Sequence, residues 1–242
     1  MSIIQDIRKT GFIKWLMRLL LIRLPLAFIA VTVLWVVMLK FVPTWFTPLM
    51  ITRSIEFRDD PSFHTRKVWK PLSDISPELA KAVIASEDNL FAEHNGFDWK
   101  ELKKAIDDHK EKGKKLRGAS TISQQTAKNV FLFPSRSFVR KAFEAYFTVL
   151  IEWIWGKERI LEVYLNVAEM GKGIYGAEAA AGEMFGKEAS ALTLKEASLI
   201  AACLPNPLER HADKPSPYVN RRAGQIRTLI PKLAYPEWVT AR

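Results

Sequence analysis

The sequence predicts a mainly α-helical domain behind one apolar N-terminal helix, and three observations lead to this class. Apolar residues recur at helical spacing from about Ile75 onward. Two capping boxes, Thr121-Ile-Ser-Gln124 and Thr193-Leu-Lys-Glu196, mark helix starts. No run of alternating apolar and polar residues indicates a strand. The 242 residues suffice for one ordinary domain and a short appendage.

The apolar helix is predicted for residues 24–42, LPLAFIAVTVLWVVMLKFV, in which Lys40 is the only charged side chain. A helix of this length extends about 28 Å, close to the roughly 30 Å hydrocarbon thickness of a bilayer. A buried core helix and a cleavable signal sequence are the alternatives, but no small-residue cleavage site follows Val42. We therefore expect an uncleaved transmembrane anchor.

The flanks of this segment predict its orientation, because basic residues that precede a span stay in the cytoplasm. The basic side chains before the span are Arg8, Lys9, Lys14, Arg18 and Arg23. The rest of the chain should then lie outside the cytoplasm. The predicted divisions are a basic cytoplasmic N-terminus at 1–23, the transmembrane helix at 24–42, a linker at 43–59, the main domain at 60–235 and a C-terminal tail at 236–242.

Helices of the main domain are predicted from their ends. Ser76 is a cap followed by proline at the first helical position, and this helix carries Glu87. Residues 138–155 and 157–168 are long runs without helix breakers, and the helix that begins near Thr193 should stop before Pro205 and Pro207. The charged segment 107–117, DDHKEKGKKLR, is predicted to be a mobile surface loop.

Composition limits the class of partner. The 36 Lys and Arg residues exceed the 26 Asp and Glu residues, and the formal charge is +10. The natural partners are therefore anions, which leaves nucleic acid, phospholipid headgroups and a phosphorylated substrate open. Cys203 is the only cysteine, so an internal disulfide is excluded, and its apolar setting predicts a buried small side chain.

The first motif, SEDNLFAEHNGFD at 86–98, places two adjacent carboxylates at a helix end, next to an aromatic ring and a histidine. The Glu87 carboxylate, beside Phe91 and near Asp88, should have a raised pKa, which suits proton abstraction from a sugar hydroxyl. A solvated helix terminus is the alternative, and it would be preferred for an isolated Glu-Asp pair.

The second motif, GASTISQQTAKN at 118–129, would place hydroxyls, amides and an ammonium along one helix. If Thr121 caps that helix, these groups lie on one face and on the ridge beside it. Such a surface suits a polyhydroxylated sugar that carries phosphates. A polar, exposed helix is the alternative, but it does not explain the paired glutamines. The side chains concerned are Thr121, Gln124, Gln125, Lys128 and Asn129.

The third motif is a basic cluster that precedes an acid. Helical spacing places Arg140 and Lys141 beside Glu144, with Arg136 just before them. By itself this is a surface ion-pair cluster that contributes a few tenths of a kcal/mol. The many aromatic residues around it suggest basic groups on a surface that touches lipid, although most of these rings could equally be core.

Together these motifs resemble the glycosyltransferase family 51 domain of peptidoglycan glycosyltransferases. Members show Glu-Asp-x-x-Phe-x-x-His-x-Gly, Gly-x-Ser-Thr-Ile-x-Gln-Gln-x-x-Lys-Asn, Arg-Lys-x-x-Glu and Lys-x-x-Ile-Leu-Glu-x-Tyr-Leu-Asn. The matching segments here are 87–96, 118–129, 140–144 and 157–166. The resemblance covers roughly residues 60–235 and implies a lysozyme-like glycosyltransferase domain of two helical lobes.

The resemblance implies an enzyme that polymerises lipid II into β-1,4-linked glycan strands and releases undecaprenyl pyrophosphate. Glu87 would be the general base on the acceptor 4-hydroxyl, and the basic residues would neutralise the leaving group. Glu144 would be a second essential carboxylate, which either holds a divalent cation such as Mg²⁺ or orients the basic residues. No other cofactor is expected. The implied substrate-binding residues are Asp88, Phe91, His94, Gly118, Ser120, Thr121, Gln124, Gln125, Lys128, Asn129, Arg136, Arg140, Lys141, Lys157, Tyr164 and Asn166.

The expected partners are lipid II, the growing lipid-linked glycan, the bacterial inner membrane and other wall-synthesis or division proteins, and not nucleic acid or a nucleotide. The G-x-G-x-x-G at 171–176 follows a predicted helix rather than a strand, so it does not indicate a dinucleotide site. The chain contains no Ser-x-x-Lys, and its one Lys-Thr-Gly, at 9–11, precedes the anchor. We therefore expect a monofunctional enzyme without a transpeptidase.

Two other functions are weighed against this one. A lysozyme-like peptidoglycan hydrolase would also place an acid near an apolar cleft, but cleavage of a neutral glycosidic bond does not need the basic cluster. A non-catalytic membrane scaffold of the wall-synthesis machinery would need no general base at Glu87.

Overall fold

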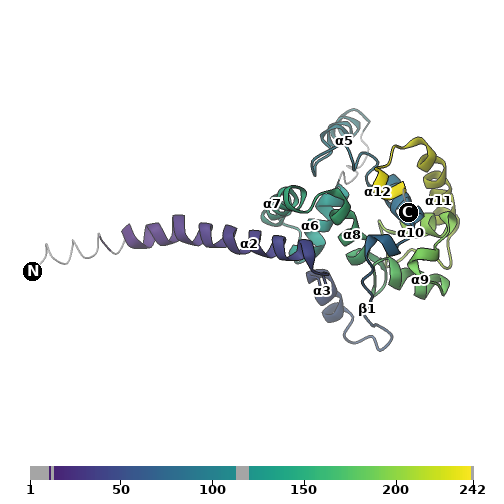
Figure 1. Cartoon of the computed structure of the whole chain (residues 1–242), viewed down its shortest axis with the longest axis horizontal. Coiled ribbons are helices and arrows are strands. Elements are labelled where there is room, and N and C mark those ends of the chain that lie inside the picture. Colours follow the sequence, from purple (N-terminus) through teal and green to yellow (C-terminus); the bar gives the residue numbers. More distant parts are fainter. Residues whose placement is uncertain (1–10, 12–13, 113–119, 241–242) are drawn as a thin grey trace, which may run out of the picture. The chain divides into compact units, whose positions relative to one another are not determined.

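The computed structural model describes Gly11 and residues 14–112 and 120–240, and it divides the chain into two compact units, Met1–Val42 and Pro43–Arg242. The described residues are mainly helical and include three short strands (Figure 1). The predicted mainly α class is confirmed.

The first unit contains one long apolar helix. It runs from Lys14 to Phe41, and by length and composition it can cross a membrane. It comprises a π-helical segment η1 (Leu19–Arg23) and α2 (Leu24–Phe41), so the helix begins earlier than the predicted span. Pro25 has no N–H to donate to the preceding turn, which explains the wider π register just before it.

The second unit holds the remaining elements. In chain order these are α3 (Pro48–Glu56), β1 (Arg66–Lys67), η2 (Leu72–Asp74), α4 (Pro77–Glu87), α5 (Trp99–Lys112), α6 (Ile122–Phe131), α7 (Phe138–Ile154), α8 (Lys157–Val167), β2 (Glu169–Gly171), β3 (Ile174–Tyr175), α9 (Ala177–Phe185), η3 (Ala189–Ala191), α10 (Leu194–Cys203), α11 (Pro217–Leu229), η4 (Ile230–Lys232) and α12 (Glu237–Thr240).

Two groups of helices form the lobes of this unit. In one lobe α10 packs against α4 and α11, and in the other α6 packs against α7, α8 and α3. Figure 1 shows α6 and α7 on one side of the unit and α10 to α12 on the other. Each lobe has a dry core, because its inward side chains are fully buried. Examples are Leu79, Ile200 and Ile226 in the first lobe and Ile122, Ile151 and Leu161 in the second.

The predicted helix starts are confirmed by their caps. The hydroxyl of Ser76 accepts a hydrogen bond from the Glu78 N–H at 3.3 Å, and Pro77 opens α4. Both capping boxes form, at the start of α6 and at the start of α10. α10 ends at Cys203, before the first of the two prolines, and the Cys203 thiol is buried as predicted.

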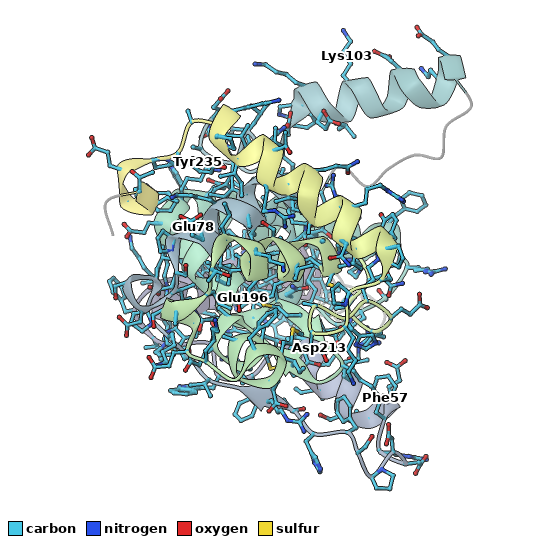
Figure 2. The ribbon with its side chains drawn as sticks, turned by 90° about the vertical axis from the view of Figure 1, so that its right-hand side faces the viewer. Phe57, Glu78, Lys103, Glu196, Asp213 and Tyr235 are labelled. Atoms are coloured by element: carbon cyan, nitrogen blue, oxygen red, sulfur yellow. The ribbon has the colours of Figure 1, made fainter. Side chains whose placement is uncertain are left out.

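The loop predicted at 107–117 is wrong for its first part, because α5 continues to Lys112. Lys and Glu are good helix formers, and a helix that is polar on most of its surface needs no apolar periodicity to form at the edge of a domain. Lys103 marks α5 in Figure 2, and its side chain is exposed. Residues 113–117 lie outside the described part of the chain.

The sequence predicts no strands, but a small sheet with the order β1-β3-β2 is present. β1 pairs with β3 in parallel, and β2 pairs with β3 in antiparallel with an irregularity between Glu169 and Gly171. Strands of two or three residues are too short to show an alternating pattern.

The sheet explains the glycine-rich segment at 171–176. This segment follows α8 and the short strand β2 and forms the β2–β3 hairpin, unlike the single turn from a strand into a helix that a dinucleotide site uses. Gly176 has φ +82°, and a Cβ there would lie 2.7 Å from the Asn166 carbonyl oxygen. The glycine therefore lets the hairpin pass directly beside the end of α8.

Candidate active site

The Glu87 carboxylate ends α4 and faces the other lobe. Its Oε2 accepts a hydrogen bond from the Gln125 side-chain amide at 2.9 Å, and its Oε1 accepts one from the Ser86 hydroxyl at 3.3 Å. Burial raises the pKa of Glu87, while these two hydrogen bonds act in the opposite direction. The raised pKa predicted from the sequence has this cause, rather than the neighbouring Asp88 charge, which is the smallest contribution.

Gln125 is oriented by a second hydrogen bond. The Tyr164 hydroxyl, fully buried in α8, donates to the Gln125 side-chain oxygen at 3.2 Å. The amide oxygen is thereby occupied, and the NH₂ group is directed at Glu87. Burial raises the pKa of Tyr164 well above its usual value, so its hydroxyl stays neutral and remains a donor. The result is a chain of donors from Tyr164 through Gln125 to Glu87.

Asp88 connects the helix that carries the base to α6. One carboxylate oxygen accepts from the Ile122 backbone N–H at 2.9 Å, and the other contacts His94 Nε2 at 2.8 Å. His94 Nδ1 accepts from the Gly96 N–H at 3.1 Å, which places the ring proton on Nε2, toward Asp88. The negative charge of Asp88 also lies at the N-terminus of α6, where the helix dipole favours it.

A cleft of about 490 Å³ lies beside Gln125, the hydrogen-bond partner of Glu87, between α3, α6, α8 and the chain that enters α7. We call it the Lys128 cleft. Four cationic side chains line it. Its full lining is Leu49, Arg53, Gln125, Lys128, Asn129, Leu132, Pro134, Ser135, Arg136, Arg140, Tyr164, Ala168, Glu169, Leu204 and Pro207.

The Lys128 ammonium lies among charged groups of both signs. Burial lowers its pKa most, the nearby charges of Glu144 and Glu87 raise it, and those of Arg140 and Lys141 lower it. Lys128 therefore interacts with the candidate base and with the basic cluster of α7 at the same time.

Glu144 holds the basic cluster in place. Its side chain is buried; one carboxylate oxygen accepts from Arg140 Nη1 at 3.0 Å, and the other accepts from the Lys141 ammonium. A Mg²⁺ ion at Glu144 would have to displace one of these cations. Elsewhere among the described residues, no three His, Cys, Asp or Glu side chains are grouped as for a metal ion. The donor set thus does not fit a resident metal at Glu144.

Arg53 is a cleft residue that the sequence interpretation missed, because it placed residues 43–59 in a linker. The guanidinium of Arg53, in α3, bonds both carboxylate oxygens of Glu169 at 3.1 to 3.2 Å and also contacts Glu56. Glu169 is buried, and burial raises its pKa, while Arg53 opposes that shift. No local motif could have revealed this pair, whose members lie 116 residues apart.

A second cleft, of about 700 Å³, lies on the other side of Glu87, and we call it the Arg221 cleft. It is bounded mainly by the end of α4, the loop after α10 and α11. Figure 2 shows α11 as the diagonal helix between the labels Tyr235 and Asp213. Gln125 lines both clefts, and Glu87, which accepts its hydrogen bond, lines the Arg221 cleft. The full lining is Ser86, Glu87, Ser120, Gln125, Pro205, Arg210, Tyr218, Arg221, Arg222 and Gln225.

The arginines of this cleft were also missed by the sequence interpretation. The only local signal was the pair of adjacent arginines in an otherwise ordinary helix, at Arg221 and Arg222. Arg222 donates to the Ser86 carbonyl at 3.4 Å, and it lowers the pKa of Glu87 through its charge. This contact brings α11 next to the base.

The predicted site residues fall into two groups. Those that line a cleft are Glu87, Ser120, Gln125, Lys128, Asn129, Arg136, Arg140 and Tyr164. Those that line neither cleft are Asp88, Phe91, His94, Thr121, Gln124, Lys141, Glu144, Lys157 and Asn166. Gly118 lies outside the described residues.

The contacts of the second group are structural. Thr121 and Gln124 exchange hydrogen bonds of 3.0 and 3.1 Å in the capping box of α6, and the Thr121 hydroxyl also donates to the Gly96 carbonyl at 2.7 Å. The face that was predicted to present Thr121 and Gln124 to a sugar is therefore turned inward, because their polar atoms are needed for the cap.

Three further members of this group support the same region. Phe91 is fully buried, and the Lys157 ammonium lies 4.6 Å from the centre of its ring. The Asn166 side chain accepts from the Lys70 N–H and donates to the Lys70 carbonyl, both at 2.8 Å. Asn166 thus links α8 to the segment that follows β1.

The chain is similar to known proteins over most of its length. The family model described as Transglycosylase matches residues 56–229. A biosynthetic peptidoglycan transglycosylase of Bacteroides thetaiotaomicron is 54% identical over 85% of this chain and 84% of its own length. Proteins of that name from Caulobacter vibrioides and Stutzerimonas stutzeri are 50% and 48% identical, over 89% and 92% of this chain and 91% and 98% of their own lengths.

Proposed function

The chain belongs to the transglycosylase family and is a peptidoglycan transglycosylase, and on this premise we propose that it polymerises lipid II into β-1,4-linked glycan strands with Glu87 as the general base. The observation that carries the proposal is the position of Glu87. Its partly buried carboxylate lines the Arg221 cleft, has a raised pKa and accepts a hydrogen bond from Gln125, the residue that lines both clefts.

In the proposed step the acceptor 4-hydroxyl loses its proton to the Glu87 carboxylate. The hydroxyl oxygen then forms a bond to the anomeric carbon of the donor sugar, and the bond from that carbon to the pyrophosphate oxygen breaks with inversion. A base with a raised pKa takes this proton more readily than an ordinary carboxylate. Undecaprenyl pyrophosphate leaves with the electron pair of the broken bond.

The Lys128 cleft is assigned to the leaving pyrophosphate. Lys128, Arg136 and Arg140 line it, and charge that develops on the departing oxygens would be stabilised by these fixed cations. Glu144 is assigned a positioning role, because both of its carboxylate oxygens accept from cations of α7. Asp88, His94 and the α6 capping box are likewise assigned to positioning rather than to contact with the sugars.

We also propose that the apolar helix anchors the protein in the bacterial inner membrane, with the N-terminus in the cytoplasm and the catalytic unit in the periplasm. Apolar side chains on α3 and α7 favour a lipid-facing surface beside the Lys128 cleft. Phe138 is 96% exposed, and Ile51 and Ile55 of α3 are exposed as well. A lipid-linked substrate could then enter the cleft without leaving the membrane. The chain is proposed to be monofunctional.

The test is polymerisation of purified lipid II by the full-length protein. Glu87→Gln keeps the shape of the side chain and removes the base, and we expect the rate to fall by about 10³. Glu93→Gln, an exposed acid of the same motif, is the matched control and should retain wild-type activity. Full activity of Glu87→Gln would remove Glu87 from its role, and breakdown of preformed glycan without any polymer would favour a hydrolase.

A further inference from the structure

Three arginines line the Arg221 cleft without a carboxylate partner. Among the described residues, Arg210, Arg221 and Arg222 form no ion pair, and Glu87 is the only acidic residue in the cleft lining. Asp213 lies in the connection between α10 and α11 (Figure 2), but it forms no ion pair with them either. The cleft therefore carries uncompensated positive charge beside the candidate base.

The three guanidinium groups fall into two sets by their neighbours, because Arg210 and Arg221 share the Tyr218 ring whereas Arg222 bonds the backbone of α4. Arg222 donates to the Ser86 carbonyl of α4 at 3.4 Å, whereas Arg210 donates to the Ala202 carbonyl of α10 at 3.3 Å. The Tyr218 ring lies beneath Arg210 at 4.9 Å and near Arg221 at 5.7 Å. Because successive side chains leave an α-helix about 100° apart, Arg221 and Arg222 also point in different directions.

These two cationic positions, the Arg210–Arg221 pair at Tyr218 and Arg222 at Ser86, fit an extended ligand with more than one anionic group better than one compact phosphate. A phosphate or pyrophosphate is best held by donors that converge on it, and the Lys128 cleft already offers such a set. The planar guanidinium group binds carboxylates and phosphates alike in a bidentate manner, so the choice between them rests on the Lys128 cleft being assigned to the pyrophosphate. In a peptidoglycan precursor, the remaining anionic groups are the free carboxylates of the peptide attached to the sugar.

We propose that the Arg221 cleft binds the carboxylates of the peptide substituent of the glycan substrate, through Arg210 and Arg221 in particular. The inference rests on the proposed function, because it places the peptide next to the sugar that reacts at Glu87. The peptide would then help to select substrates and to align the sugar, while the pyrophosphate is held in the other cleft.

The test uses two lipid-linked disaccharides, one with its peptide carboxylates free and one with the same peptide fully amidated. For the double variant Arg210→Gln, Arg221→Gln we expect the KM for the free-carboxylate substrate to rise about ten-fold, equivalent to about 1.4 kcal/mol, with kcat unchanged. The KM for the amidated substrate should not change. Arg222 is left intact because it contacts the residue before Glu87.

Arg227→Gln is the matched control, because Arg227 lies in the same helix and lines neither cleft. It should behave as wild type with both substrates. An equal rise in KM for both substrates would overturn the inference and would indicate that these arginines bind the pyrophosphate. Wild-type kinetics of the double variant with both substrates would overturn it as well.

A binding measurement separates this inference from the proposed function. A soluble muramyl peptide without lipid or phosphate, titrated calorimetrically into the full chain, should bind to wild type and about ten-fold more weakly to the double variant. If the peptide binds in this way but lipid II is not polymerised, the proposed function fails and the peptide site stands. If polymer forms but no such binding difference appears, the peptide site fails and the function stands.

Discussion

The two clefts that share Gln125 differ in whether their arginines are paired with carboxylates. In the Lys128 cleft, Arg140 is paired with the buried Glu144, and Arg53 is paired with the buried Glu169. In the Arg221 cleft, the arginines contact carbonyl oxygens and one aromatic ring, and among the described residues none of them forms an ion pair with a carboxylate. The same residue type is therefore held rigidly on one side of the base and left available to an outside anion on the other.

This difference has a physical meaning. A buried carboxylate fixes the geometry of a cation in advance, and this matters where charge develops briefly in a transition state. It also neutralises part of the attraction for a ground-state anion. An unpaired arginine keeps its full attraction, which suits binding of a charge that is present throughout the reaction. The comparison thus distinguishes the cleft that we propose for catalysis from the cleft that we propose for recognition.

The largest expected effect comes from removing the carboxylate that pairs with the cations of the Lys128 cleft. Glu144→Gln should lower kcat about 100-fold, because Arg140 and Lys141 lose the acid that orients them toward the leaving group. We also expect a loss of about 1–2 kcal/mol in the free energy of unfolding. This is less than the 3–5 kcal/mol typical of fully buried pairs, because the Lys141 side chain is half exposed.

Polymerisation rates and thermal unfolding would check both parts of this prediction. Glu183→Gln is the control, because it breaks the Arg66–Glu183 pair, whose members are both exposed. That variant should change neither quantity measurably. If Glu144→Gln behaved like Glu183→Gln, pairing in the Lys128 cleft would have no catalytic value.

A second prediction concerns Gln125, the residue shared by the two clefts. Its hydrogen bond lowers the pKa of Glu87, so Gln125→Ala should raise that pKa further. A general base works only when deprotonated, so the acidic limb of the kcat profile should move to higher pH. Activity below that limb should fall about ten-fold, while activity above it should change less.

The pH profile of polymerisation between about pH 5 and 9 would measure this shift. Asn129→Ala is the comparison variant, because Asn129 lines the same cleft but has no hydrogen bond with Glu87. It should change KM without moving the acidic limb. An unmoved limb in Gln125→Ala would show that Glu87 is not the group that titrates.

The smallest expected effect comes from making the second cleft resemble the first. Gln225→Glu places a carboxylate one helical turn from Arg221, within the same cleft. The new ion pair should stabilise α11 by about 0.3–0.5 kcal/mol and raise KM for the free-carboxylate substrate about three-fold. Gln225→Ala controls for loss of the amide. An unchanged KM in Gln225→Glu would argue against recognition of carboxylates by Arg221.

Several features of the fold could be predicted from local sequence, because they depend on near neighbours. The Ser76 cap and the Thr121 capping box define the starts of α4 and α6, and each is complete within a few residues. The short β2–β3 hairpin could not be predicted, since its strands gain stability only through their tertiary neighbours. α5 was missed for a different reason: its apolar residues, Trp99, Leu102 and Ile106, are few, and the charged run that follows them is typical of a surface loop.

The candidate site likewise has a part that the local sequence predicts and a part that it does not. The motif around Glu87 predicted a general base, and the family resemblance predicted the class of enzyme, which the relatives confirm. The motif did not reveal that the Thr121 and Gln124 side chains are used within the cap, because polarity alone does not distinguish a cleft from a cap. It also did not reveal Arg53, whose partner Glu169 belongs to a different element.

The sequence by itself determined the capped helices and the apolar N-terminal segment and predicted Glu87 as the base, since these follow from spacing, caps and side-chain chemistry along the chain. Only the tertiary structure decided how Glu87 is used. It brings Gln125, 38 residues away, against the carboxylate, and it places Arg222 beside Ser86 across 136 residues. Such contacts depend on how the lobes pack, and no local pattern encodes the distance between two helices that meet only in the folded chain.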